Sequence, residues 1–237
     1  MIGILTYDHP HRKTQDLISK LLIKGYKELI IIATPFYERK KFIPLYQHRP
    51  THCVNIGLDE LCKNLNLKLV KCEISYLADC LTSLNLENIL IGGAGILPEE
   101  IAKNFKIINS HPGYLPIVKG LDALKWAIYY NQPIGVTTHF ISKTTDEGIL
   151  IDRKLVPIYF EDTFHSIAFR QYEMEIDMLV EAIEISKNLK EIIELTDDNF
   201  KANKRMPHHL ENIMMKKFEQ RVQNSPSFRE IELKNED

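Results

Sequence analysis

The chain has 237 residues, enough for one large domain or for one domain with an appendage. Its 44% hydrophobic and 26% charged residues are ordinary for a soluble globular protein, and its net charge of −2 gives no basic excess of the kind that nucleic-acid-binding proteins carry. No apolar stretch approaches a membrane span, and the N-terminus lacks the pattern of a signal peptide. We therefore expect a soluble, cytoplasmic protein that binds neither nucleic acid nor membrane.

The first half of the chain alternates short apolar strands with helices. We predict strands at 2–7, 29–33, 67–70 and 88–91, and helices at 14–26, 59–65, 76–84 and from Pro98 onward. The β-branched run at 29–33 is typical of a strand buried on both faces. This order predicts an α/β fold of Rossmann-like type, with a mostly parallel twisted sheet flanked by helices.

The cysteines carry no metal-binding or disulfide pattern. They are separated by nine, ten and eight residues, without a Cys-x-x-Cys pair. We interpret them as reduced thiols and expect no metal site. The residues are Cys53, Cys62, Cys72 and Cys80.

The second half continues the same pattern and ends on a change of composition. After the strand that ends near His111, we predict a helix at 120–130, a strand at 135–141, an edge strand at 149–158 and a long amphipathic helix at 162–189. Charged and amide residues dominate from Thr196 onward. We therefore divide the chain into an α/β domain at 1–195 and a C-terminal helical extension at 196–237.

Polar side chains stand where two predicted strands end. Asn109 and His111 are two residues apart, so they share one face of their strand. The glycine-rich run at 92–95 follows the preceding strand, and ligands of open α/β sheets bind beyond the carboxyl ends of strands. These positions favour a binding site, with a capped strand-end turn and a packing turn as the alternatives. His139 is interpreted as a satisfied buried histidine, with a supporting role near the site as the alternative.

The order of several short motifs resembles a known enzyme family. Asn109-Ser110-His111 is followed by Leu115-Pro116, by Lys119-Gly120 and by the loop Asp146-Glu147-Gly148. This series resembles the formyltransferases that use N10-formyltetrahydrofolate: the glycinamide ribonucleotide, methionyl-tRNA and nucleotide-sugar enzymes. The resemblance covers about residues 85–155 and implies an α/β fold and transfer of a formyl group to an amine.

The chemistry of formyl transfer suits these side chains. The tetrahedral intermediate carries negative charge on the formyl oxygen, to which the amide of Asn109 can donate. His111 can stabilise that charge when protonated or accept the amine's proton when neutral. Asp146 can hold the imidazole and relay a proton, or it can merely shape its own loop. The resemblance implies catalytic roles for these three residues, and the choice of base between His111 and Asp146 stays open.

The resemblance also implies a pterin pocket formed largely by backbone groups. It lies between the loop after the fourth strand and the Asp146 loop, and glycines there allow a flat heterocycle to approach closely. N10-formyltetrahydrofolate is the expected co-substrate. The residues implied are Gly93, Ala94, Gly95, Ile96, Leu97, Ser142, Thr145 and Asp146.

The acceptor is predicted by comparing the branches of the family. Glycinamide ribonucleotide enzymes carry a glycine-rich phosphate loop after the first strand, where this chain has the segment 6–12 without glycine. The tRNA enzymes carry a second, basic domain of about a hundred residues, whereas only about 40 residues follow the core here. We therefore expect a nucleotide-sugar acceptor of the dTDP-4-amino-4,6-dideoxyglucose type, and a place in O-antigen or lipopolysaccharide biosynthesis.

Such an acceptor needs cations for its pyrophosphate and aromatic rings for its base. The cations available are Arg12, Lys13, Arg39, Lys40 and Arg49, and the expected acceptor contacts are Tyr7, Lys13, Arg39, Tyr46, Tyr76 and Lys119. The alternatives are glycinamide ribonucleotide formyltransferase, formyltetrahydrofolate hydrolase and a folate-binding module without activity. We also expect a homodimer.

Overall fold

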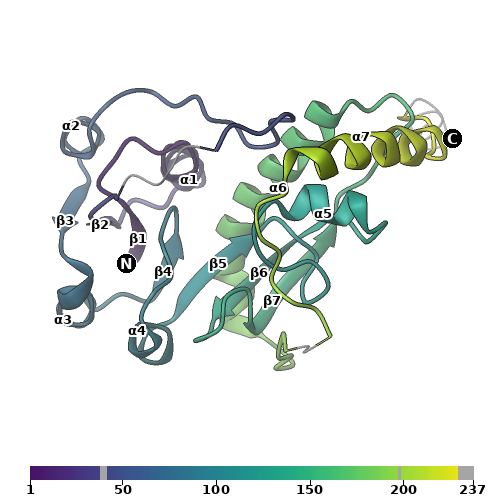
Figure 1. The fold of residues 1–237 in the computed structure, drawn as a ribbon. Helices are drawn as coiled ribbons and strands as arrows, with labels where there is room; N and C mark the ends of the chain where they lie inside the picture. Colours follow the sequence, from purple (N-terminus) through teal and green to yellow (C-terminus); the bar gives the residue numbers. More distant parts are fainter. Residues whose placement is uncertain (38–41, 197–198, 229–237) are drawn as a thin grey trace, which may run out of the picture.

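One seven-stranded sheet forms the framework of the protein (Figure 1). The computed structural model describes residues 1–37, 42–196 and 199–228. Within these ranges the strands run in the order β3-β2-β1-β4-β5-β6-β7. Their bounds are Ile2–Tyr7 (β1), Leu29–Thr34 (β2), Lys68–Lys71 (β3), Asn88–Ile91 (β4), Ile107–His111 (β5), Gly135–Ile141 (β6) and Gly148–Leu155 (β7).

The sheet is mixed but mostly parallel, which confirms the predicted fold class. Strands β3, β2, β1, β4 and β5 are parallel neighbours, whereas β6 is antiparallel to both β5 and β7. Because β6 reverses direction, the connection at 112–134 leaves and re-enters the sheet at the same end. The early part of this connection, including Gly113 and Val118, thereby lies beside His111.

Helices cover both faces of the sheet because side chains alternate along each strand. Ile4, Leu90 and Ile108 pack with α1 (Arg12–Ile23), α2 (Leu58–Asn64) and α6 (Phe164–Ile185). The alternate strand positions pack with α3 (Leu77–Leu84) and α4 (Glu99–Asn104) on the opposite face. Two short 3₁₀ turns, η1 (Ile74–Tyr76) and η2 (Ser186–Asn188), complete these layers.

The start of α6 explains why its sequence was recognisable as a helix. Thr163 accepts a hydrogen bond from the Ser166 backbone N–H at 3.1 Å, and Ser166 Oγ accepts one from the Thr163 N–H at 2.9 Å. This capping box satisfies amides that have no partner within the helix and contributes about 1 kcal/mol. The predicted helix at 162–189 is therefore present over Phe164–Ile185.

The last helix joins the core of the second half of the sheet. Helix α7 (His208–Gln223) packs against α5 (Ala123–Tyr129), and Figure 1 shows α7 crossing beside α5 and α6. Lys125 and Glu211 form an ion pair between these helices, with both side chains fully buried. Met206, Met214, Phe218 and Val222 lie in the same hydrophobic cluster as Val118, Val136 and Ile167.

The helix predicted at 120–130 begins three residues late. Gly120 and Asp122 have φ angles of +89° and +52°, so neither can form part of a right-handed helix. Residues 120–122 instead make a turn that reaches the site described below.

Two kinds of feature are absent from the described ranges. None of the helices there is both long and apolar enough to cross a membrane. The same ranges hold no group of three or more His, Cys, Asp or Glu side chains able to bind a metal ion.

Candidate active site

The polar end of β5 faces away from α1 and α6. Ile108 packs under those helices. Because side chains alternate along a strand, Asn109 and His111 point to the opposite face of the sheet, the face that Ile107 also occupies. Asn109 is paired with His139 of β6 across the antiparallel ladder, and His111 with Thr137. These four polar side chains therefore share one face of the sheet.

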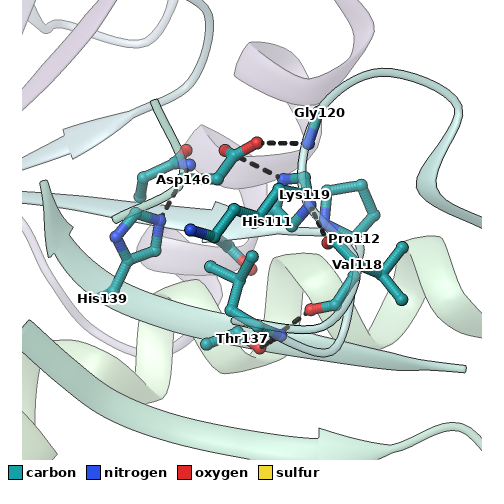
Figure 2. A network of polar contacts seen from close by, with 12 residues as sticks. His111, Pro112, Val118, Lys119, Gly120, Thr137, His139 and Asp146 are labelled. Atoms are coloured by element: carbon teal, nitrogen blue, oxygen red, sulfur yellow. Dashed lines mark hydrogen bonds and ion pairs between the residues drawn. The ribbon is translucent and has the colours of Figure 1, made fainter. Parts of the chain in front are cut away.

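The loop between β6 and β7 brings Asp146 back to His111. Asp146 has φ +57°, and its Oδ1 lies 3.2 Å from His111 Nδ1 while its Oδ2 accepts a hydrogen bond from the Gly120 N–H at 2.7 Å (Figure 2). Burial opposes ionisation of this carboxyl, but His111 and the Gly120 N–H outweigh it and lower the pKa of Asp146 to about 2. Asp146 is therefore a carboxylate at neutral pH.

Both ring nitrogens of His111 face hydrogen-bond acceptors. Nδ1 faces the Asp146 carboxylate, and Nε2 lies 3.0 Å from the backbone carbonyl of Val118. A neutral imidazole has one N–H, so it can donate to only one of these two groups. His111 can donate to both acceptors only when each ring nitrogen carries a proton.

His139 fixes the orientation of Asn109. Its Nδ1 lies 3.0 Å from the Glu147 carbonyl, which only accepts, so Nδ1 carries the proton and Nε2 accepts from Asn109 Nδ2 at 3.4 Å. Burial lowers the pKa of His139 to about 4, which keeps the ring neutral at pH 7. This agrees with the satisfied buried histidine expected from the sequence, and it leaves one N–H of Asn109 for another partner.

The loop after β5 is closed around the imidazole. Thr137 Oγ donates to the Gly113 carbonyl at 2.8 Å and accepts from the Leu115 N–H at 3.1 Å. A Cβ on residue 113 would lie 2.4 Å from the Val118 oxygen, the atom that faces His111. The close approach of this loop to the imidazole therefore requires glycine at position 113.

The two segments expected to hold the pterin flank β5. Residues 92–97 follow β4, the parallel neighbour of β5, and residues 142–146 lead into the carboxylate that contacts His111. Gly93 is packed against the rings of His11 and Tyr7, where a Cβ would stand 2.9 and 3.0 Å from them. Ile96, by contrast, is 83% exposed and offers an apolar surface to a flat ligand.

Among the residues predicted to contact the acceptor, Lys13 lies close to the end of β5. Its Nζ is 3.3 Å from the Ser110 carbonyl and 2.8 Å from Glu175 Oε1, and Arg49 binds the other oxygen of Glu175. Glu175 is buried; burial opposes its ionisation, but Arg49 and Lys13 outweigh that effect and lower its pKa. Nothing in the sequence distinguishes Glu175 from the other acidic residues of α6, so its place in this cluster was not predictable.

The remaining predicted acceptor contacts are scattered. Tyr46 packs on Phe164 and its hydroxyl lies 3.4 Å from Asn212, so α7 and not the site surrounds it. Tyr76 is 65% exposed beside β3, which β2, β1 and β4 separate from β5. Lys119 is buried against Glu147 at 2.8 Å. Arg39 and Lys40 lie outside the described residues.

Comparison with known proteins identifies the family of this region. Residues 67–183 match the family model described as formyl transferase. Over 103 residues, 42% of this chain and 49% of the relative, the sequence is 33% identical to the phosphoribosylglycinamide formyltransferase of Haemophilus influenzae. It is 27% identical over 183 residues, 73% of this chain and 55% of the relative, to a methionyl-tRNA formyltransferase of Caldanaerobacter subterraneus. The chain thus spans about half the length of these curated relatives.

A solved structure supports the same grouping at the level of the fold. The sugar N-formyltransferase from a Shewanella species superposes with a TM-score of 0.59 and 18% identity, covering 92% of this chain and 87% of that one. At this identity the likeness shows a shared fold.

Proposed function

Because residues 67–183 belong to the formyl transferase family, a family of enzymes, we propose that this protein transfers a formyl group from N10-formyltetrahydrofolate to an amine. One observation carries the proposal. Asn109, His111 and Asp146 converge on one face of β5, with the imidazole 3.2 Å from the carboxylate. The three groups to which the resemblance gives catalytic roles therefore lie together, with His111 and Asp146 in direct contact.

The contacts suggest a separate task for each group. Asn109 donates its remaining N–H to the formyl oxygen as negative charge develops there. His111, when both of its ring nitrogens carry protons, places a positive charge beside that oxygen. Asp146 is ionised and relays the proton that the attacking amine loses, directly or through water, to the N10 nitrogen of the departing tetrahydrofolate. In this division Asp146 moves the proton and His111 supplies charge.

For the acceptor, we propose a nucleotide-linked amino sugar of the dTDP type. Lys13 of α1 and Arg49 place two cations on Glu175 of α6, beside the carbonyl of Ser110 near the carboxyl end of β5 and on the face opposite to the His111 side chain, and the cluster keeps a net positive charge. Ser110 Oγ is buried without a hydrogen-bond partner among the described residues. A pyrophosphate can contact such cations.

Aromatic rings lie near the carboxyl ends of the neighbouring parallel strands β1 and β2. His9 and Phe36 are stacked with ring centroids 4.7 Å apart, and Tyr7 meets Phe36 edge-on at 5.4 Å. Phe36 is 41% exposed, so part of its ring is open to a ligand. An apolar base suits this surface. The solved structure that shares this fold is described as a sugar N-formyltransferase.

A second candidate acceptor is glycinamide ribonucleotide. The 33% identity to the phosphoribosylglycinamide enzyme over 103 residues favours it. Against it, the segment after β1 contains no glycine, so its backbone amides cannot wrap a phosphate as a glycine-rich loop does.

The test is a competition between acceptors. Purified protein is incubated with excess N10-formyltetrahydrofolate and equal concentrations of a dTDP-amino-deoxysugar, glycinamide ribonucleotide or charged initiator tRNA, and with no amine. Release of tetrahydrofolate and the mass of each product are followed. We expect fastest transfer to the nucleotide sugar.

Each other outcome has a defined meaning. Faster transfer to glycinamide ribonucleotide would overturn the acceptor and keep the chemistry. Equal folate release without any amine would identify a hydrolase. Absence of turnover in all four reactions would reject formyl transfer itself.

A further inference from the structure

The segment between α6 and α7 pairs with the loop that carries Lys119 and Gly120. The Asn203 N–H and its side-chain Nδ2 both donate to the Lys119 carbonyl at 3.0 Å, and the Leu121 N–H donates to the Asn203 carbonyl at 2.9 Å. Gly120 and Asn203 form an isolated parallel β-bridge. Residue 203 is thus joined to the loop by three hydrogen bonds, one of which uses its side chain.

Two further contacts anchor this segment on the core. The Met206 N–H donates to Asp122 Oδ2 at 2.9 Å, and Trp126 Nε1 donates to the Lys204 carbonyl at 2.7 Å. The Met206 side chain is fully buried. The segment that carries residue 203 is therefore held in place by contacts of residues 204 and 206 with the core, in addition to its contacts with the loop at 119–121.

The loop held in this way makes the second contact of the catalytic carboxylate. The Gly120 N–H points at Asp146 Oδ2, and the other oxygen of Asp146 meets His111, as Figure 2 shows. Gly120 has φ +89°, and a Cβ there would stand 2.2 Å from the Asn203 carbonyl oxygen. Backbone contact between residues 120 and 203 therefore sets the direction of the Gly120 N–H, from which Asp146 accepts a hydrogen bond.

We propose that Asn203 is a positioning residue that holds the Gly120 N–H on the carboxylate of Asp146. This inference rests on the proposed formyl transfer for its kinetic consequences, but its geometry belongs to the chain itself. No local pattern around Asn203 predicts the role, because its partners lie more than eighty residues earlier.

Two substitutions test the proposal. Asn203→Ala keeps both backbone hydrogen bonds and removes the side-chain donor; Asn203→Asp keeps the shape and turns an acceptor toward the Lys119 carbonyl. We expect kcat to fall about fivefold in the first and about tenfold in the second, as the loss of one hydrogen bond predicts, with KM for both substrates unchanged. Lys201→Ala, an exposed side chain of the same segment, is the matched control and should keep wild-type kinetics.

The readout specific to positioning is the titration of Asp146. Loss of a well-directed Gly120 N–H removes one of the contacts that favour the carboxylate, so the acidic limb of the pH–rate profile should move to higher pH in both variants. Carbon-13 NMR of the Asp146 side chain should report the same displacement in the full-length protein without substrate.

The outcomes separate the two proposals. An unchanged NMR titration in both variants, with or without a lower melting temperature, would overturn the positioning role. A displaced titration together with a wild-type protein that transfers formyl groups to no acceptor would retain the role and reject the proposed function.

Discussion

The two sides of the proposed active site differ in how their polar groups are paired. On the catalytic side, each ring nitrogen of His111 and His139 and both oxygens of Asp146 have a partner within the protein. On the acceptor side, the aromatic pair of His9 and Phe36 is partly exposed, and the cations gather on a single carboxylate.

This difference indicates two kinds of specificity. A fully paired centre fixes the reacting groups before substrate arrives and so limits what chemistry can occur. A partly exposed edge with excess cations is completed by its ligand, so its residues decide which acceptor binds. Substitutions on the two sides should therefore change different kinetic constants.

The largest effect is expected at the end of β5. His111→Ala or Asn109→Ala should lower kcat by about 100-fold or more, because each removes a group directed at the developing oxyanion. KM for the acceptor should change little. Steady-state kinetics of folded variants provide the measurement, with His209→Ala, an exposed histidine of α7, as control. Wild-type turnover in His111→Ala would remove the catalytic side of the comparison.

Asp146→Asn should lower kcat by about 10- to 100-fold while keeping the shape of the side chain. The amide cannot accept the amine's proton, and one of its ends must present N–H groups to a donor, either His111 Nδ1 or the Gly120 N–H. The acidic limb of the pH–rate profile should disappear with it. If rate and profile both survive, Asp146 serves only to shape its loop.

The same carboxyl should make stability depend on pH. Its folded-state pKa of about 2 lies below the ordinary 3.8, so the ionised form stabilises the fold above about pH 4, and this contribution is lost as pH falls toward 2. The contribution is about 2 kcal/mol. Urea unfolding of wild type and Asp146→Asn at pH 7 and pH 2.5 should show the two stabilities converging at the lower pH. A constant difference between them would contradict the assignment.

The smallest effect is expected on the acceptor side. Lys13→Ala should raise KM for the nucleotide sugar about tenfold and leave kcat nearly unchanged. It removes one protein cation that would contact the bound nucleotide sugar and no group that would contact the reacting atoms. The dependence of KM on salt should also weaken. Lys20→Ala, on the same helix and paired with Asp177, is the matched control. A fall in kcat alone would place Lys13 on the catalytic side.

The fold was predictable wherever local pattern and tertiary contacts agree. Strands β1, β4 and β6 have the bounds expected from their apolar runs, and Asn109 and His111 lie on a shared face as their spacing requires. The start of α5 was wrong by three residues because Gly120 and Asp122 adopt positive φ, a conformation that the approach of Asn203 imposes from elsewhere in the chain.

The supporting residues of the site were not predictable. Val118 and Gly120 act through backbone atoms, which carry no side-chain signal in a sequence. Glu175 gains its role from two cations on other segments. Conversely, Tyr46 and Tyr76 were expected to contact the acceptor because aromatic rings can pack against its base or sugar, and the fold takes them to α7 and to the edge of the sheet.

The contact between residues 120 and 203 also concerns the order in which the chain is made. Asn203 and Met206 are synthesised more than eighty residues after Lys119 and Gly120. Asn203 binds the Lys119 carbonyl and packs against the turn at Gly120. A nascent chain synthesised only as far as β7 already contains Asn109, His111 and Asp146. It does not yet contain the carbonyl groups of residues 203 and 204, to which Leu121 N–H and Trp126 Nε1 donate in the folded protein. The segment that supports the Gly120 contact of Asp146 is thus synthesised after all three residues of the proposed catalytic set.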